Sequence, residues 1–145
     1  MSQPSYSNIP QPGSPTQTEA WALTESARRI MVAMVDAQKS GDLEKPAANK
    51  LLREALRLNW RLWTIFQAEL TLENSPVPED IRQNVLTLAQ FVDKQTPQCL
   101  AELKSSDIEG LININRNLAQ GLLEGLSQDQ PAPEPGQPLN LNGSV

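Results

Sequence analysis

Apolar residues recur every three or four positions through the middle of the chain, and no stretch alternates apolar and polar residues for long enough to indicate a strand. A spacing of three and four places apolar side chains on one face of an α-helix. The pattern predicts four amphipathic helices, over residues 16–41, 46–72, 78–103 and 106–126. Because the connections between them are short, the sequence predicts an all-α fold, a compact four-helix antiparallel bundle.

Local signals mark where these helices begin. Thr16 with Glu19, and Ser106 with Glu109, have the spacing of a capping box, in which two side chains satisfy free backbone N–H groups at a helix start. Pro78 fits the first position of the third helix, where a missing N–H costs nothing. These signals predict that the first, third and fourth helices begin at or beside these residues.

The third helix contains a proline. Cys99 and Leu103 continue its apolar face beyond Pro97, which predicts a kink or a brief break at the proline and no true end. Cys99 is the only cysteine of the chain. Its place on the apolar face favours a small core residue over a reactive thiol.

The two ends of the chain differ in composition from the middle. Four of the 12 prolines lie in the first 15 residues and four lie after residue 130, among Gln, Ser, Asn and Gly. Such segments bury too little apolar surface to offset the entropy lost on ordering. We therefore predict disordered tails at 1–15 and 127–145 on either side of a helical domain at 16–126.

Composition excludes several kinds of chemistry. The chain has no histidine, so histidine-based triads and imidazole metal sites are absent, and its single thiol cannot form an internal disulfide. We find no carboxylate pair, no nucleophile with a base and no glycine-rich phosphate loop. The sequence predicts a protein that is not an enzyme, with no catalytic residues, no metal ligands and no cofactor.

Hydropathy and charge indicate where the protein works. The longest apolar run, residues 30–35, has six residues, whereas a membrane-spanning helix needs about 20. The N-terminus has neither the basic start nor the apolar stretch of a secretory signal. Without either feature, the chain is expected to be cytoplasmic, without membrane insertion; its formal net charge is −5.

The second helix has a broad apolar face with an amide at its centre. The face comprises Leu52, Ala55, Leu56, Leu62, Trp63, Phe66 and Leu70, and Leu51, Leu58 and Ile65 widen it to nearly half the circumference. Asn59 lies mid-face, and Asn115 has the matching place in the fourth helix. An unpaired buried amide costs about 1–3 kcal/mol. The two asparagines are therefore expected to pair with each other and fix how their helices dock, or to contact a partner.

Opposite this face runs a basic ridge. It consists of Lys50, Arg53, Arg57 and Arg61, with Trp60 beside them. Arginine and tryptophan together can contact phosphates and stack on bases, as in RNA-binding proteins. The acidic net charge and the single aromatic residue favour a solvated face, or a protein contact at Trp60, over nucleic acid. Trp21 also lies off the main apolar stripe of its helix, which indicates a helix edge or a partner surface.

Three segments together resemble a known family. They are residues 58–70 (LNWRLWTIFQAEL), 78–92 (PEDIRQNVLTLAQFV) and 112–122 (ININRNLAQGL). In this order and with these gaps, they resemble the bacterial flagellar biosynthesis regulator FlaF family. The resemblance covers most of residues 17–126 and includes neither tail.

The resemblance implies a cytoplasmic, non-enzymatic helical protein that promotes flagellin synthesis and export, with flagellin and the regulator FlbT as partners. A small bundle could shelter an amphipathic flagellin helix in a groove, as a chaperone does. The residues expected to bind a partner are Asn59, Trp60, Trp63, Phe66, Trp21 and Asn115. The alternative is a post-transcriptional regulator that acts on flagellin mRNA, either directly through the basic ridge or through FlbT.

Overall fold

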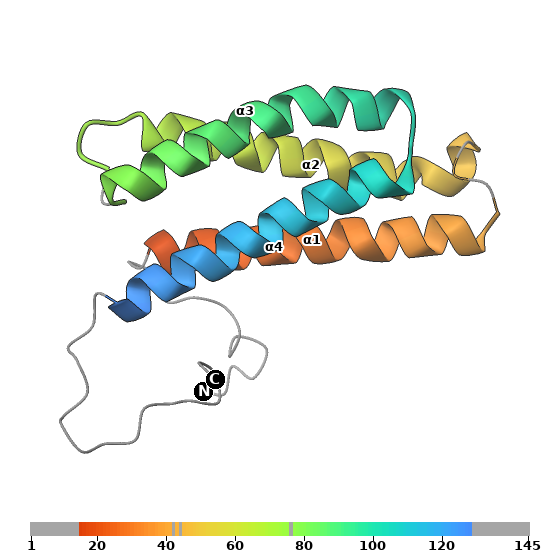
Figure 1. Cartoon of the computed structure of the whole chain (residues 1–145). Coiled ribbons are helices and arrows are strands. Elements are labelled where there is room, and N and C mark those ends of the chain that lie inside the picture. Colours follow the sequence, from red (N-terminus) through yellow and green to blue (C-terminus); the bar gives the residue numbers. More distant parts are fainter. Residues whose placement is uncertain (1–14, 42, 44, 76, 129–145) are drawn as a thin grey trace, which may run out of the picture.

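The chain folds into four helices. The computed structural model describes residues 15–41, 43, 45–75 and 77–128. The helices are α1 (Pro15–Lys39), α2 (Pro46–Leu70), α3 (Glu79–Ala101) and α4 (Ser105–Gln128), and the described residues contain no strand (Figure 1). The predicted all-α class is confirmed, and each helix lies within a few residues of its predicted range.

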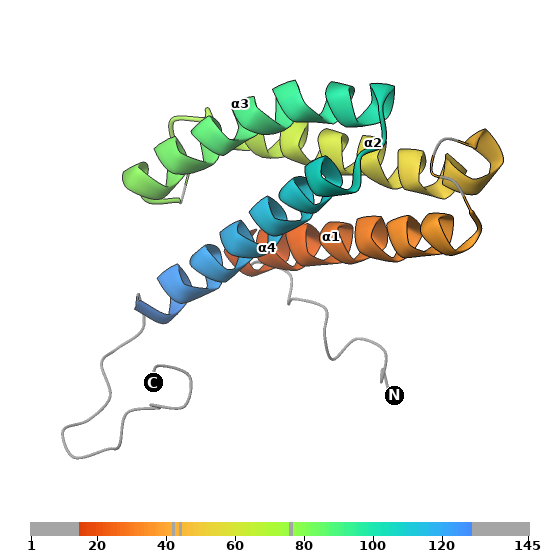
Figure 2. The same ribbon diagram turned by 45° about the vertical axis from the view of Figure 1, so that its right-hand side comes forward.

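The helices form a ring in chain order. Each helix packs closely against the two helices next to it in that ring, α1 against α2 and α4, and α3 against α2 and α4, while the backbones of the diagonal pairs lie farther apart. Successive helices run in opposite directions, and α4 crosses the bundle obliquely (Figures 1 and 2). The most extensive contact is between α1 and α4. The predicted antiparallel four-helix bundle is therefore confirmed.

One helix signal requires correction. The backbone N–H of Ile108 donates to the carbonyl of Lys104 at 3.1 Å, so α4 begins at Ser105 and Ser106 lies inside its first turn. The predicted N-cap position of Ser106 was wrong. Residues 79–101 form one continuous helix through Pro97, which confirms that the proline does not end the helix; of the two predicted alternatives, the break is excluded.

The ends of α1 and α4 pass slightly beyond the predicted domain. Helix α1 starts one residue inside the predicted N-terminal tail, and α4 extends two residues into the C-terminal one. The rest of both predicted tails, 1–14 and 129–145, lies outside the described residues, as does the side chain of Thr16. The disorder expected of these tails therefore stays a prediction.

The core is built from the predicted stripes of all four helices. Trp63 is its largest fully buried side chain and packs edge-on against Phe66, with ring centroids 6.0 Å apart. Cys99 is buried, as expected, and burial raises the pKa of its thiol. Around them lie Ala20, Leu23, Ala27, Ile30, Met34, Leu52, Leu56, Val85, Ala89, Val92, Ile108, Leu111, Ile112, Leu118 and Leu122.

The apolar face of α2 is narrower than the sequence indicated. Leu51, Leu58 and Ile65, predicted to widen it, are 66%, 50% and 49% exposed. They belong to a separate strip on the outside of the helix, because the ring places no further helix over that side.

Candidate functional site

The polar centre of the bundle joins three helices. The amide nitrogen of Asn115 donates to Oδ1 of Asn59 at 2.7 Å, which confirms the predicted pairing. The same nitrogen donates to the backbone carbonyl of Leu23 at 3.1 Å, and the indole N–H of Trp63 donates to Oδ1 of Asn115 at 2.9 Å. The hydroxyl of Ser26 donates to Oδ1 of Asn59 at 2.9 Å. These bonds tie α1, α2 and α4 together at one level.

The donors and acceptors around Asn59 and Asn115 determine the orientation of each side-chain amide. An indole N–H can only donate and a backbone carbonyl can only accept, so Trp63 and Leu23 determine which way Asn115 is turned. Asn59 must then present its oxygen to Asn115. Its Nδ2 is left as the one buried side-chain nitrogen or oxygen without a hydrogen-bond partner among the described residues.

Four of the residues expected to bind a partner lie in this core. Asn59, Trp63, Phe66 and Asn115 are buried between the helices, so their contacts in this conformation are with other parts of the chain. Of the two roles left open for the asparagines, docking of the helices is the one the geometry supports. Contact of these four side chains with a partner stays a prediction that requires the bundle to open.

One member of the predicted basic ridge, Arg53, and Trp60 beside it face a neighbouring helix. The guanidinium of Arg53 donates to Oδ1 of Asn49 at 3.0 Å and also to the backbone carbonyl of Leu100 on α3. The indole N–H of Trp60 donates to a carboxylate oxygen of Asp93 on α3 at 2.9 Å. The prediction that Arg53 and Trp60 belong to an outward ridge was therefore wrong, because both side chains help to dock α3 on α2.

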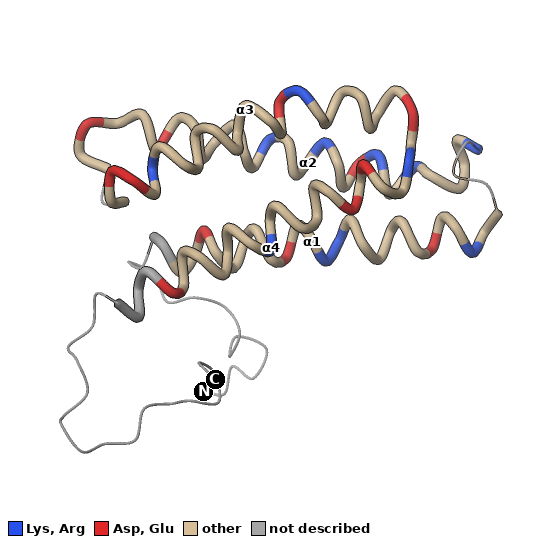
Figure 3. The backbone as a smooth tube through the Cα atoms, viewed as in Figure 1, with Lys and Arg blue, Asp and Glu red and all other residues tan. Residues whose placement is uncertain are grey.

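Three members of the predicted ridge are exposed. Lys50, Arg57 and Arg61 project from the outer side of α2, and we call these three residues the exposed ridge. Figure 3 shows basic positions along α2 and acidic positions at the connection from α2 to α3.

A line of exposed apolar residues runs along the same helix. Leu51, Leu58 and Ile65 are seven residues apart, so they point in nearly the same direction. We call this line the α2 stripe. Leu72, another seven residues on and just past the end of α2, is 55% exposed. The seven-residue spacing is a signal in the sequence, but the same residues also fit the edge of the core face.

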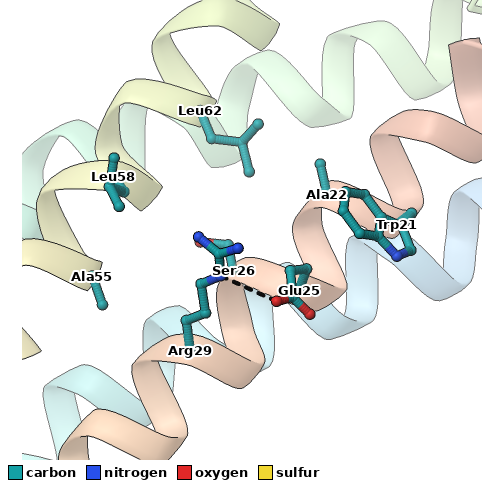
Figure 4. A pocket seen from close by; sticks show the side chains of 8 residues that line it. All are labelled: Trp21, Ala22, Glu25, Ser26, Arg29, Ala55, Leu58 and Leu62. Carbon is teal, nitrogen blue, oxygen red and sulfur yellow. Dashed lines mark hydrogen bonds and ion pairs between the residues drawn. The ribbon is translucent and has the colours of Figure 1, made fainter. Parts of the chain in front are cut away.

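A hollow of about 210 Å³ lies between α1 and α2, next to the stripe (Figure 4). Trp21, 39% exposed, forms one wall, and contact of this side chain with a partner stays a prediction. Ser26, which bonds to Asn59, connects the hollow to the polar centre. We call it the α1–α2 groove; its lining is Trp21, Ala22, Glu25, Ser26, Arg29, Ala55, Leu58 and Leu62.

The charges on the α1 side of the groove are paired. Glu25 accepts hydrogen bonds from Arg28 at 2.7 Å and 2.9 Å and from Arg29 at 3.1 Å. The hydrogen bond from Arg28 is the main reason that the pKa of Glu25 falls to about 2, and Arg29 adds to the effect. Glu25 is thus ionised at neutral pH, and this turn of α1 keeps one net positive charge.

A different hollow lies between α1 and α4. Its volume is about 520 Å³, and four of its six lining residues are polar: Thr24, Arg116, Gln120 and Glu124, beside Ala119 and Leu123. The α1–α2 groove has five apolar lining residues and adjoins the α2 stripe, so it is the stronger candidate for binding an apolar helix face.

Two carboxylates meet near the end of the bundle where α1 begins and α2 ends. Burial of Glu19 beside Phe66 and Leu70, together with a hydrogen bond and charge repulsion from Glu69, raises the pKa of Glu19 to about 7. Glu19 therefore gains or loses a proton near neutral pH. This titration makes the pH dependence of stability a test of the local packing.

Metal sites and membrane spans are two further possibilities. Within the part of the chain that the structure describes, no group of three or more His, Cys, Asp or Glu residues has an arrangement that could hold a metal ion. No helix there is long and apolar enough to cross a membrane.

Comparison with known proteins identifies a family. The family model described as flagellar protein FlaF matches residues 2–122. The match begins well before residue 17, so the expectation that the N-terminal segment falls outside the resemblance was wrong. Searches of curated proteins and of solved structures returned no match. Because the family match spans more than half of the 145 residues, the chain belongs to the FlaF family of flagellar proteins.

Proposed function

We propose that this protein is a non-enzymatic regulator in the cytoplasm that binds flagellin and promotes its synthesis and export. Family membership supports a role connected with the flagellum. The observation that carries the binding proposal is the α2 stripe beside the α1–α2 groove, an exposed apolar surface on a bundle whose core is otherwise closed.

The shape of this surface suits a helix. From Leu51 to Ile65 the α2 stripe extends about 21 Å, at 1.5 Å per residue, which is about four turns of a partner helix. An amphipathic helix laid along it would cover side chains that are now about half exposed, and would gain about 1 kcal/mol for each leucine or isoleucine. Binding in this mode would shield the apolar face of a flagellin helix before export.

Gel filtration tests the proposal directly. The full chain is mixed with monomeric flagellin at moderate salt, and with flagellin that lacks its terminal segments. We expect co-elution with intact flagellin and weaker co-elution with the truncated protein. Failure of the wild-type chain to co-elute with intact flagellin would refute the proposed function.

A matched pair of variants tests the surface. Leu58→Glu places a charge in the α2 stripe, and Leu123→Glu places the same charge at a leucine of similar exposure, 46%, on α4. We expect Leu58→Glu to lose flagellin and Leu123→Glu to retain it, with both variants folded by circular dichroism. Equal loss in both variants, or in neither, would contradict binding at the stripe.

The alternative, direct action on flagellin mRNA, has less support. It relied on four basic residues and an aromatic residue on one outward face, and Arg53 and Trp60 are bonded to α3. Regulation through FlbT requires no RNA contact and is compatible with flagellin binding. A pull-down with FlbT, in the presence and absence of flagellin, tests whether the chain binds FlbT and whether it binds FlbT and flagellin together.

A further inference from the structure

The proposed function leaves one surface feature without a role, the exposed ridge of Lys50, Arg57 and Arg61. At about 100° per residue, Arg61 lies about 60° and Arg57 about 100° around α2 from Leu58, on the side away from the core. Asn59, at the centre of the buried face, lies about 100° from Leu58 in the opposite sense. The exposed ridge therefore borders the α2 stripe along its solvent side.

The other border of the groove also carries an arginine. Arg29 lines the groove on α1, and Glu25, the carboxylate beside it, is shared between Arg28 and Arg29. A helix seated in the groove would thus lie between Arg29 on one side and Arg57 and Arg61 on the other.

The sign of these charges indicates what kind of helix fits. Between residues 50 and 61, the α2 side of the groove carries three basic side chains, Lys50, Arg57 and Arg61, against one acidic side chain, Glu54. That is a local net charge of +2 on a chain whose formal net charge is −5. A second copy of the chain would bring an equally positive border to the groove, so like charges oppose self-association there.

We propose that the α1–α2 groove selects an amphipathic helix with acidic residues along its edges, and that the exposed ridge is its electrostatic recognition element. The proposal rests on the proposed function and specifies it further. The bound flagellin segment has apolar residues that cover Leu51, Leu58 and Ile65, and Asp or Glu residues that face Arg57 and Arg61. The apolar contacts hold the helix, while the charges set its rate of association and its orientation.

Charge reversal tests the ridge independently of the apolar contacts. The affinity of the full chain for intact flagellin is measured by calorimetry at 50 mM and 300 mM NaCl, for the wild type and for Arg57→Glu/Arg61→Glu. We expect about tenfold weaker binding of the variant at the lower salt concentration, and a smaller difference at the higher one, because salt screens exposed charges. Arg116→Glu/Lys104→Glu reverses two exposed basic residues outside α2, so it changes the net charge by the same amount; it is the matched control and should change affinity less than twofold.

The outcomes separate this proposal from the proposed function. If wild-type protein does not bind flagellin, the function itself is refuted. If flagellin binds and Leu58→Glu abolishes binding, but Arg57→Glu/Arg61→Glu binds as the wild type does at both salt concentrations, the function stands and the electrostatic proposal is overturned. A loss in Arg116→Glu/Lys104→Glu equal to that in the ridge variant also overturns it, since the effect is then one of total charge.

Two further measurements test other occupants. Light scattering of the free chain that shows a dimer dispersed by Leu58→Glu would assign the groove to a second copy and overturn the proposal. Gel-shift binding of flagellin mRNA that is lost in Arg57→Glu/Arg61→Glu, with flagellin binding intact, would assign the ridge to RNA and overturn it as well. A monomer with no mRNA shift, and a ridge variant deficient in flagellin binding alone, supports it.

Discussion

Leucine at Asn115 and leucine at Asn59 should have different effects on stability, although each removes the same hydrogen bond between the two amides. We expect Asn115→Leu to lower the free energy of unfolding by about 3 kcal/mol and Asn59→Leu to lower it by about 1 kcal/mol or less. The difference arises from the groups that each substitution leaves buried without a partner.

Removal of Asn115 leaves the indole N–H of Trp63 without an acceptor inside the core. An orphaned buried donor costs about 1–3 kcal/mol. The bonds to Asn59 and to the carbonyl of Leu23 are lost as well, each with a net value of about 0.5–1.5 kcal/mol. These contributions add up to between about 2 and 6 kcal/mol, a range that includes the expected loss of about 3 kcal/mol.

Removal of Asn59 has a compensation. Its Oδ1 accepts from Ser26 and Asn115, but its Nδ2 is already unpaired and buried. Leucine loses two bonds and at the same time removes that unpaired donor, whose burial costs about 1–3 kcal/mol. Asn115 keeps its bond to Leu23, and Ser26, which is only partly buried, can bond to water.

Urea unfolding followed by circular dichroism measures both effects, provided that the dependence on urea concentration is unchanged between variants. The double variant should be no less stable than Asn115→Leu alone, because the compensation at Asn59 persists. An Asn59→Leu variant that is destabilised as much as Asn115→Leu would refute the assignment of the unpaired Nδ2 and the inventory built on it.

Three other predictions concern single residues. Because the pKa of Glu19 is raised from 4.5 to about 7, the folded chain holds a proton that the unfolded chain releases between these values, so stability falls as pH rises through this range. Glu19→Gln should abolish that fall and stabilise the protein by about 1 kcal/mol at pH 8, after allowance for solvent screening, with no gain at pH 4; thermal unfolding at both values checks it. Gly110→Ala should stabilise α4 by about 1 kcal/mol, since a Cβ there meets nothing within 4 Å; an unchanged or lower melting temperature contradicts this. Cys99 should react with a disulfide reagent far more slowly in the folded chain than in urea, and equal rates would show that it is not buried.

The spacing of apolar residues alone was sufficient to predict the all-α class, the four helices and most of the core. Each helix has one apolar face, and that face is the one that becomes buried. The pairing of Asn59 with Asn115 was also predictable, since two amides at matching places on facing stripes have few other partners. Asn49 and Thr96, both buried, were not anticipated. Each bonds to a nearby backbone carbonyl, Leu43 and Val92 respectively, and such local bonds leave no periodic trace in the sequence.

The surface was harder to predict than the core. Arg53 and Trp60 align with the ridge by spacing, but long side chains at the edge of a helix can turn toward a neighbour, and the position of α3 decides that they do. In the same way, spacing assigns Leu58 and Ile65 to the apolar face of α2. The arrangement of the four helices leaves that side of α2 uncovered, so both side chains are exposed. Both outcomes depend on tertiary placement, on which a single helix carries no information.

The closure of α4 on α1 has a consequence for biosynthesis. The polar centre joins Leu23 and Asn115, which are 92 positions apart, so no shorter nascent chain can complete it. During translation, the face of α1 that packs on α4 stays exposed, or contacts other helices, until α4 has left the ribosome. Folding of the bundle is thus coupled to synthesis of α4, and a message truncated before α4 would yield a product whose apolar face on α1 is exposed to proteases.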